Sequence, residues 1–367
     1  PRLTRLAHLI PVPSPPHTAR SSLSCSPAKA TNTATYLVMT SFPPTFTPRT
    51  LTIPHSLSSS LSPTILFAQV SSPPSATPDS PVLVFIHGYP QNHTLWAPLM
   101  RWYEEEGSEV LRRFRLVVPD LPGYGKSRKV ISPDGSHLAN SKREVGRDML
   151  SLVDALFPSN PPVVLIGHDR GARVAYRLAK DRPDRIVGLN VQDIVPTPVQ
   201  FKRLTYDSTP RHVATFRMYH WVLLAMPPPL PEQLIFSTPE QSVWYARHSL
   251  TSWSGPAAKA VYDQELMDSW CEQYADKDVL LGALEDYRAG ATVDLEHDEA
   301  DGDHILSLSS AQQPSRLSIP LLALWCPGLQ ATGSSIPAEQ EAGGVEGIWK
   351  ARGPEGEKTR AKEVETE

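Results

Sequence analysis

The segment VVLIGHDRGARVAYRLA spans residues 163–179 and carries the strongest structural signal in the chain. Its apolar first half is typical of a buried strand, and its second half has helical spacing. Gly167, Asp169 and Gly171 lie between the two halves. Small residues on both sides of a central one match the nucleophile elbow, a tight strand-to-helix turn that projects the central side chain from the strand's carboxyl end. The segment therefore predicts that Asp169 reaches a cleft.

An aspartate at this corner indicates a particular chemistry. Attack of a carboxylate on a carbonyl would give a labile anhydride, whereas attack on a saturated carbon bearing a leaving group gives an ester that water can cleave. Asp169 is therefore the candidate nucleophile of an alkyl-transfer and hydrolysis reaction. The alternative is an Asp169 that does no more than pair with the neighbouring arginine.

Further apolar runs before and after this segment predict a sheet. They are 82–86 (VLVFI), 115–119 (RLVVP), 163–167 (VVLIG), 186–191 (IVGLNV) and 319–325 (IPLLALW). Continuous apolar runs separated by helical stretches are typical of a mostly parallel sheet flanked by helices, which is an α/β fold. Residues 49–70 are expected to add one or two short strands.

Composition divides the chain into five parts. We expect a Pro/Ser-rich disordered extension (1–48), the first part of the core (49–197), a helical cap (198–305), the remaining core strand (306–328) and a disordered tail (329–367). The cap is inferred because the stretch between the fourth and fifth apolar runs is too long for one crossover and is rich in Trp and Tyr. The tail is rich in Gly, Glu and Lys, so the last strand and helix of the core are expected to be missing.

The overall composition points to small-molecule chemistry. A formal net charge of -4 gives no electrostatic reason to bind nucleic acid or an anionic membrane. Three scattered cysteines fit neither a disulfide framework nor a metal site, so we expect no metal and no cofactor. We predict a soluble, cytoplasmic protein, and a homodimer is left open. The acid-free segment before Met39 is the alternative signal of organelle targeting.

The stretch FIHGYPQNHTLW (85–96) adds an oxyanion hole to the predicted site. The backbone N–H groups of Tyr89 and Arg170 are its expected donors. Arg170 and Arg173 are three residues apart, nearly one helical turn, so both guanidinium groups can flank one pocket. Two such groups suit a substrate carboxylate bound bidentately. The alternative for Arg173 is a solvated helix face.

These motifs together resemble the α/β-hydrolases of the fluoroacetate (haloacetate) dehalogenase type, which belong with haloalkane dehalogenases and epoxide hydrolases that share an Asp nucleophile. The matching stretches are HGYPQN, DLPGYGKS, GHDRGARVAYRLA, VQDIVPT and DYRAGATVD, within about residues 81–325. The resemblance implies an α/β-hydrolase fold with an inserted helical cap. It also implies hydrolysis of the carbon–halogen bond of small haloacids through an alkyl-enzyme ester.

The same resemblance implies roles for four further residues. His220, Trp221 and Tyr287 match the family's halide-binding groups, and Asp193 matches the acid that orients the general base. In the family that base is a histidine after the last strand, but no histidine follows His304 here. Neither His304 nor His297 is expected to replace it. Turnover by this chain is therefore expected to be lost or slow.

Two other functions stay open at this point. An epoxide hydrolase is favoured if Tyr287 has a partner in the cap and if the two arginines face solvent. A truncated or non-catalytic carboxylate-binding relative is the other alternative.

Overall fold

The structure is a computed structural model that describes residues 40–106, 111–204, 218–303, 316–326, 344–354 and 359–364. All of these ranges belong to one structural unit. Most of the predicted N-terminal extension, its targeting segment and His304 lie outside the described residues.

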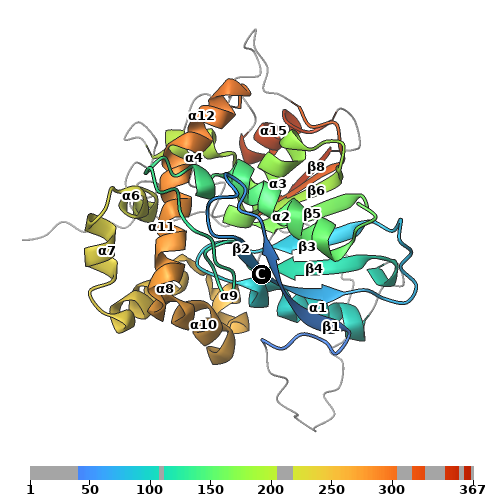
Figure 1. Cartoon of the computed structure of the whole chain (residues 1–367), viewed down its shortest axis with the longest axis horizontal. Coiled ribbons are helices and arrows are strands. Elements are labelled where there is room, and N and C mark those ends of the chain that lie inside the picture. The colour runs from blue at the N-terminus through green and yellow to red at the C-terminus, as the bar shows by residue number, and fades with distance from the viewer. Residues whose placement is uncertain are drawn as a thin grey trace, which may run out of the picture. The chain divides into compact units, whose positions relative to one another are not determined.

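An eight-stranded sheet forms the centre of this unit, in the order β1-β2-β4-β3-β5-β6-β7-β8 (Figure 1). The strands are β1 (Phe46–Ile53), β2 (Thr64–Ser71), β3 (Val82–Ile86), β4 (Arg115–Pro119), β5 (Val163–His168), β6 (Ile186–Gln192), β7 (Leu321–Trp325) and β8 (Thr359–Glu363). β2 pairs antiparallel with β1 and β4, and every other neighbouring pair is parallel. The prediction of a mostly parallel α/β sheet is confirmed.

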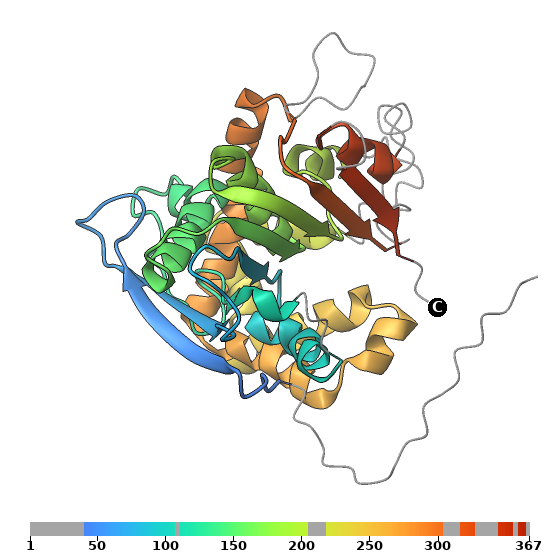
Figure 2. The same ribbon diagram turned by 90° about the vertical axis from the view of Figure 1, so that its right-hand side faces the viewer.

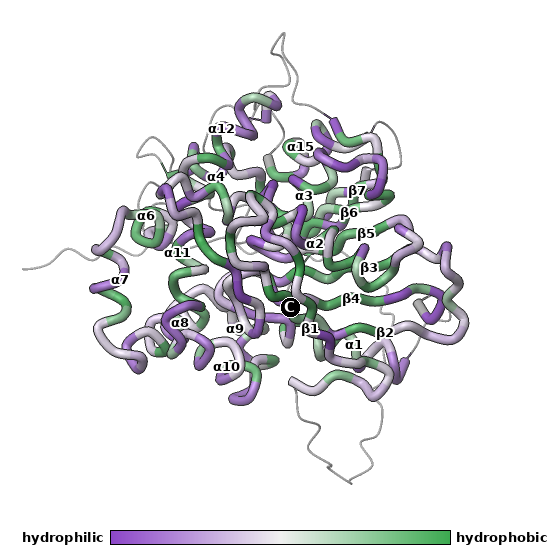
Figure 3. The backbone as a smooth tube through the Cα atoms, viewed as in Figure 1, coloured by the Kyte–Doolittle hydropathy of each residue, from purple (hydrophilic) through white to green (hydrophobic). Residues whose placement is uncertain are grey.

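The strands are apolar throughout because both faces of the sheet are covered. In β3, Val84 and Ile86 pack in the core on one face, whereas Phe85 packs on the other with Met100 of α1. Such alternation places successive side chains on opposite faces. Figure 3 shows the result, with central strands largely green and the outer helices α7, α8 and α10 carrying much purple.

The helices form two groups. Those of the core are α1 (Ala97–Glu105), α2 (Lys142–Leu156), α3 (Arg170–Asp181) and α15 (Gly344–Lys350), with 3-10 turns η1 (His93–Trp96), η2 (Leu111–Arg113) and η3 (Leu138–Asn140). Those inserted between β6 and β7 are α4 (Thr197–Arg203), α6 (Tyr219–Ala225), α7 (Leu230–Ile235), α8 (Pro239–Trp253), α9 (Pro256–Val261), α10 (Gln264–Cys271), η4 (Glu272–Ala275), α11 (Lys277–Ala291) and α12 (Val293–Ala300). Helices α6, α7, α8 and α10 lie together beside the sheet, on the left of Figure 1.

Short polar residues begin several of these cap helices. Thr238 caps α8 and Asp263 caps α10, each side chain accepting a hydrogen bond from a first-turn N–H. The cap is then held against the core by close backbone contact. A Cβ added to Gly282 of α11 would lie 2.5 Å from Cα of Gly123. Only glycines allow these two backbones to approach so closely.

The expectation of a missing last strand and helix is wrong. β8 pairs parallel with β7, and α15 packs beside it (Figure 2). The Trp349 indole of α15 is buried and donates a hydrogen bond of 3.0 Å to the carbonyl of Ile194. Val345, Ile348 and Trp349 have the spacing of one helix face, and this local pattern outweighs the polar composition that suggested disorder.

A smaller correction concerns the other end of the core. Residues 46–48 were assigned to the disordered extension, but they begin β1 and pair with β2 through the register Phe46↔Ser71. Phe46 is buried in the core under α1. The sheet therefore begins three residues earlier than the sequence pattern indicated.

Candidate active site

Asp169 lies at the corner between β5 and α3, as the sequence predicts. Its backbone has φ 49° and ψ −121°, a conformation that most residues avoid. Its N–H donates a hydrogen bond of 3.1 Å to the carbonyl of Gln192 on β6. A Cβ added to Gly171 would lie 2.2 Å from the carbonyl oxygen of His87. The corner is therefore fixed by backbone contacts that require glycine beside it.

The Tyr89 backbone N–H donates a hydrogen bond of 2.9 Å to Oδ1 of Asp169. The loop that carries Tyr89 is held by His87, whose Nδ1 lies 2.9 Å from the Gly88 carbonyl and whose Nε2 accepts from the Leu121 N–H at 2.9 Å. Burial lowers the pKa of His87 to about 4, so this ring is neutral. One predicted oxyanion donor thus points at the nucleophile. The Arg170 N–H stays a prediction.

Arg170 does not pair with Asp169. Its Nε donates to Oδ2 of Asp286 at 2.7 Å, and its Nη2 donates to Oδ1 at 3.0 Å and to the Asp286 carbonyl at 2.5 Å. Its Nη1 is buried and has no hydrogen-bond partner among the described residues. The interpretation of Asp169 as one half of an Asp–Arg salt link is therefore wrong, because the described residues place the neighbouring arginine on a different carboxylate.

Arg173 is the second predicted carboxylate-binding residue, and it is buried instead of solvated. Both guanidinium groups lie over the Trp221 ring, with Cζ of Arg170 at 5.1 Å and Cζ of Arg173 at 4.7 Å from its centroid. Because both guanidinium groups lie over one indole ring, they are close to each other in the structure. That both arginines bind one substrate carboxylate stays a prediction.

Arg173 has no carboxylate partner among the described residues. Its Nη1 donates a long hydrogen bond of 3.4 Å to the Thr197 hydroxyl, and its Nε has no partner in the described part of the chain. Burial, followed by the positive charge of Arg170, lowers the pKa of Arg173 to about 10. A buried cation without a counter-ion is costly, so this site is suited to a small anion.

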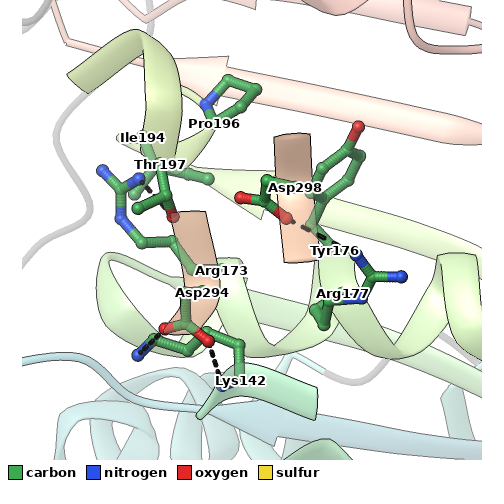
Figure 4. Close-up of a pocket in the computed structure, with 9 residues that line it drawn as sticks. All are labelled: Lys142, Arg173, Tyr176, Arg177, Ile194, Pro196, Thr197, Asp294 and Asp298. Carbon is green, nitrogen blue, oxygen red and sulfur yellow. Dashed lines mark hydrogen bonds and ion pairs between the residues drawn. The ribbon is translucent and has the colours of Figure 1, made fainter. Parts of the chain in front are cut away.

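A small pocket lies beside the Arg173 side chain (Figure 4). Its lining residues are Lys142, Arg173, Tyr176, Arg177, Ile194, Pro196, Thr197, Asp294 and Asp298. The two carboxylates in it are already paired, Asp294 with Lys142 at 3.0 Å and Asp298 with Arg177 at 3.5 Å. Neither carboxylate forms a hydrogen bond or an ion pair with Arg173 in the described part of the chain.

The three predicted halide-binding residues come together beside Tyr89. The Tyr287 ring centroid lies 5.9 Å from that of His220, 5.6 Å from that of Trp221 and 5.2 Å from that of Tyr89. All of these rings are buried. Burial raises the pKa of Tyr287, so its phenol stays protonated and can donate a hydrogen bond.

Asp193 follows β6 directly, and β6 is the neighbour of the strand that carries Asp169. Its Oδ1 accepts a hydrogen bond of 3.1 Å from the Cys326 N–H, just after β7. The Val364 N–H, just after β8, donates to the Trp325 carbonyl at 2.7 Å, so the chain after β8 leaves the sheet at this same edge. Among the described residues, no histidine is hydrogen-bonded to Asp193. His297 lies on α12.

Some residues near the site were missed by the sequence analysis. Asp286 holds Arg170, the Trp253 ring centroid lies 4.3 Å from that of His220, and the buried Tyr274 phenol has no hydrogen-bond partner among the described residues. Asp286 lay inside a motif that had been noted, and helix spacing could have marked it as facing the core. Nothing local in the sequence distinguishes Trp253 or Tyr274 from other cap aromatics.

The described residues show no helix long and apolar enough to cross a membrane. Within the same ranges, no group of three or more His, Cys, Asp or Glu side chains is arranged to hold a metal ion.

The family is shown by comparison with known proteins. The model of the alpha/beta hydrolase family matches residues 83–317, so the chain belongs to that family. This is the class that the eight-stranded sheet and the strand–turn–helix corner define.

Two curated relatives are dehalogenating or epoxide-hydrolysing proteins. A fluoroacetate dehalogenase of Burkholderia sp. is 34% identical over 222 residues, covering 60% of this chain and 66% of the relative. An epoxide hydrolase of Caballeronia sordidicola is 35% identical over 114 residues, covering 30% of this chain and 31% of the relative. The match thus spans just under two thirds of the first relative and about a third of the second.

Solved structures agree with the fold. A Pseudomonas aeruginosa protein provisionally assigned as an epoxide hydrolase is similar with a TM-score of 0.64 and 28% identity, over 88% of this chain and 90% of that one. A provisionally assigned alpha/beta hydrolase from Nostoc sp. is similar with a TM-score of 0.63 and 28% identity, over 87% and 90% of the two chains.

Proposed function

We propose that the chain carries out the displacement reaction of a haloacetate dehalogenase, with a small haloacid such as fluoroacetate as the substrate. The observation that carries the proposal is Arg173, a buried cation with no carboxylate partner among the described residues, which lies over the same indole as Arg170. A substrate carboxylate supplies the missing negative charge. The similarity to a fluoroacetate dehalogenase supports the same substrate class.

The two carboxylate oxygens of Asp169 have different surroundings. Oδ1 accepts the Tyr89 N–H, which leaves Oδ2 as the attacking atom. Oδ2 forms a bond to the carbon next to the substrate carboxylate, and the carbon–halogen bond breaks with its electron pair leaving on the halide. Oδ1 then becomes the carbonyl oxygen of the ester and stays next to the N–H that can stabilise negative charge on it in the second step.

The departing halide is received by hydrogen-bond donors. Tyr287 offers an O–H, Trp221 an indole N–H and His220 a ring N–H. Fluoride is a poor leaving group, so several converging donors are needed as its charge develops. The contacts among these three rings support this role.

Hydrolysis of the ester requires a base that removes a proton from water. Asp193 is the residue proposed to orient that base, at the sheet edge where the chain leaves β8. The sequence in hand has no histidine after His304, and among the described residues none contacts Asp193. We therefore expect these residues to complete the alkylation and to release glycolate slowly.

The test is incubation with fluoroacetate followed by peptide mass spectrometry. Fluoroacetate is used because simple thiols do not displace fluoride, so the cysteines do not obscure the result. We expect one adduct, on Asp169, with one fluoride released per chain, and no adduct in Asp169→Asn. An unmodified wild-type Asp169 would overturn the proposed reaction.

An epoxide hydrolase is the second candidate function. One of its two conditions is supported, because Tyr287 contacts the rings of His220 and Trp221 in the cap. The other is not supported, because Arg170 and Arg173 are 1% and 4% exposed and do not face solvent. Adduct formation with styrene oxide but not with fluoroacetate would select this alternative.

A further inference from the structure

Asp286 is the meeting point of four segments of the chain. Besides Arg170 of α3, its carboxylate accepts hydrogen bonds from the Tyr124 hydroxyl at 3.0 Å and from Lys142 Nζ at the start of α2. Asp286 itself lies on α11, a cap helix. The cap and the core are therefore joined at one buried carboxylate, directly behind the proposed substrate site.

The charges around Asp286 are balanced without a substrate. Arg170 and Lys142 contribute two positive charges, and Asp286 and Asp294 contribute two negative ones. Burial alone would raise the pKa of Asp286, but the two cations lower it well below its ordinary value, so it stays ionised. The charge of Arg170 is thus already neutralised. Arg173 is the cation left without a counter-ion among the described residues.

The hydrogen bonds around Arg170 also determine which of its atoms is available. Nε and Nη2 are both bound to Asp286, and Nη1 alone lacks a partner in the described part of the chain. The Arg170 guanidinium is further held over the Tyr287 ring, with Cζ at 4.0 Å from its centroid. A guanidinium fixed on two sides in this way presents one N–H group in one direction.

We propose that Asp286 is a positioning residue that aims Nη1 of Arg170 at the substrate carboxylate, while Arg173 supplies the charge that binds it. This inference rests on the proposed function. It replaces the bidentate binding expected from the sequence with one carboxylate that bridges the two arginines. Arg170 then determines how the substrate is oriented, and Arg173 determines how tightly it is bound.

The test separates orientation from affinity by using an inert carboxylate and a reacting one. Acetate binding is measured by calorimetry, and the first-order rate of Asp169 alkylation is measured at saturating fluoroacetate. In Asp286→Asn we expect the alkylation rate to fall at least about tenfold, since small misplacements of a reacting group are costly. The dissociation constant for acetate should not rise by more than about threefold, because Arg173 is unchanged and the charge of Arg170, no longer neutralised by Asp286, favours an anion.

Two further variants control for a merely structural effect. Glu285→Gln removes the neighbouring buried carboxylate of α11, which pairs with His137 and Arg288 and not with Arg170, so its alkylation rate should stay within about threefold of wild type. Tyr124→Phe removes one hydrogen bond to Asp286 and should lower the alkylation rate by a few-fold. It keeps the proposal testable if Asp286→Asn does not fold. Equal losses of rate in the Asp286 and Glu285 variants, or a parallel loss of rate and acetate affinity, would overturn the proposal.

A crystal structure of the protein with bound acetate tests the role of Asp286 independently of the alkylation reaction. We expect one acetate oxygen within hydrogen-bond distance of Nη1 of Arg170 in the wild type, and loss of this contact in Asp286→Asn. Acetate that contacts only Arg173 in the wild type, or an unchanged contact in the variant, would contradict the proposed role of Asp286. If the wild type binds acetate in this way but is not alkylated by fluoroacetate, the proposed reaction is wrong and the role of Asp286 in binding stands.

Discussion

Arg173→Met is expected to stabilise the folded protein while it abolishes carboxylate binding. Methionine keeps the long apolar stem of Arg173 and removes its buried charge, which has no carboxylate partner among the described residues. Replacing a buried charge by a hydrophobic residue of similar size is neutral or stabilising. The charge at position 173 would therefore favour carboxylate binding and lower the stability of the fold, a trade-off that is common at ligand-binding sites.

The magnitude follows from the electrostatics of the site. Burial lowers the pKa of Arg173 from its ordinary value to about 10, which corresponds to about 3 kcal/mol of destabilisation at about 1.4 kcal/mol per pKa unit. The variant also loses the cation–π contact between Arg173 and Trp221, which costs about 1 kcal/mol of stability. The net gain is about 2 kcal/mol, or a Tm about 4 °C higher.

The assay is thermal unfolding of wild type and variant with and without acetate. Acetate should raise the Tm of the wild type, because a ligand that binds only the folded state stabilises it, and should not change that of Arg173→Met. The matched control is Arg177→Met, one turn further along α3. Arg177 pairs with Asp181, Asp298 and Asp301, so its loss should destabilise by about 3 kcal/mol. Comparable destabilisation in both variants would refute the assignment of Arg173 as an unpaired cation.

Three further predictions concern the halide, the buried acid beside α3 and the corner. Tyr287→Phe should lower the rate of Asp169 alkylation about 100-fold with fluoroacetate and less with bromoacetate, as followed by mass spectrometry of the peptide that carries Asp169. Equal losses would argue against a halide-binding phenol. Burial, with Asp303 and Asp294 nearby, raises the pKa of Asp298 from 3.8 to about 7, so its ionisation should destabilise the fold as pH rises across this range. Asp298→Asn should therefore raise the Tm at pH 8 and leave it unchanged below pH 4, in parallel melts. Gly171→Ala should prevent folding, because its Cβ would meet a carbonyl oxygen at 2.2 Å, whereas Gly188→Ala, with its nearest contact at 3.5 Å, should give normal yields of soluble protein.

The parts of the fold that depend on neighbouring residues in sequence were predictable. β3 and β4 have the bounds that the apolar runs indicated, Val82–Ile86 and Arg115–Pro119. The corner at Asp169 was predictable because its glycines are required by contacts within one strand–turn–helix unit. The clustering of Tyr287 with the adjacent residues His220 and Trp221 was anticipated from the family resemblance, since Tyr287 is distant from them in sequence.

The parts that depend on long-range pairing could not be predicted. The spacing of Arg170 and Arg173 predicted that both flank one pocket. It did not predict that Arg170 forms an ion pair with Asp286, 116 residues further along the chain. Whether a buried arginine is free or paired depends on which carboxylate the cap brings to it. The same limitation explains β8, whose residues are polar in composition and form a strand by pairing with β7.

The bend at position 169 does not depend on the side chain that it displays. Its carbonyl accepts hydrogen bonds from the N–H groups of Ala172 and Arg173, and its own N–H is bound to the adjacent strand. The backbone therefore determines where the side chain at position 169 is placed, and the identity of that side chain determines the chemistry. A serine or cysteine installed there would meet the same Tyr89 amide, which is the arrangement of an acyl-transfer nucleophile instead of the proposed alkyl-transfer one.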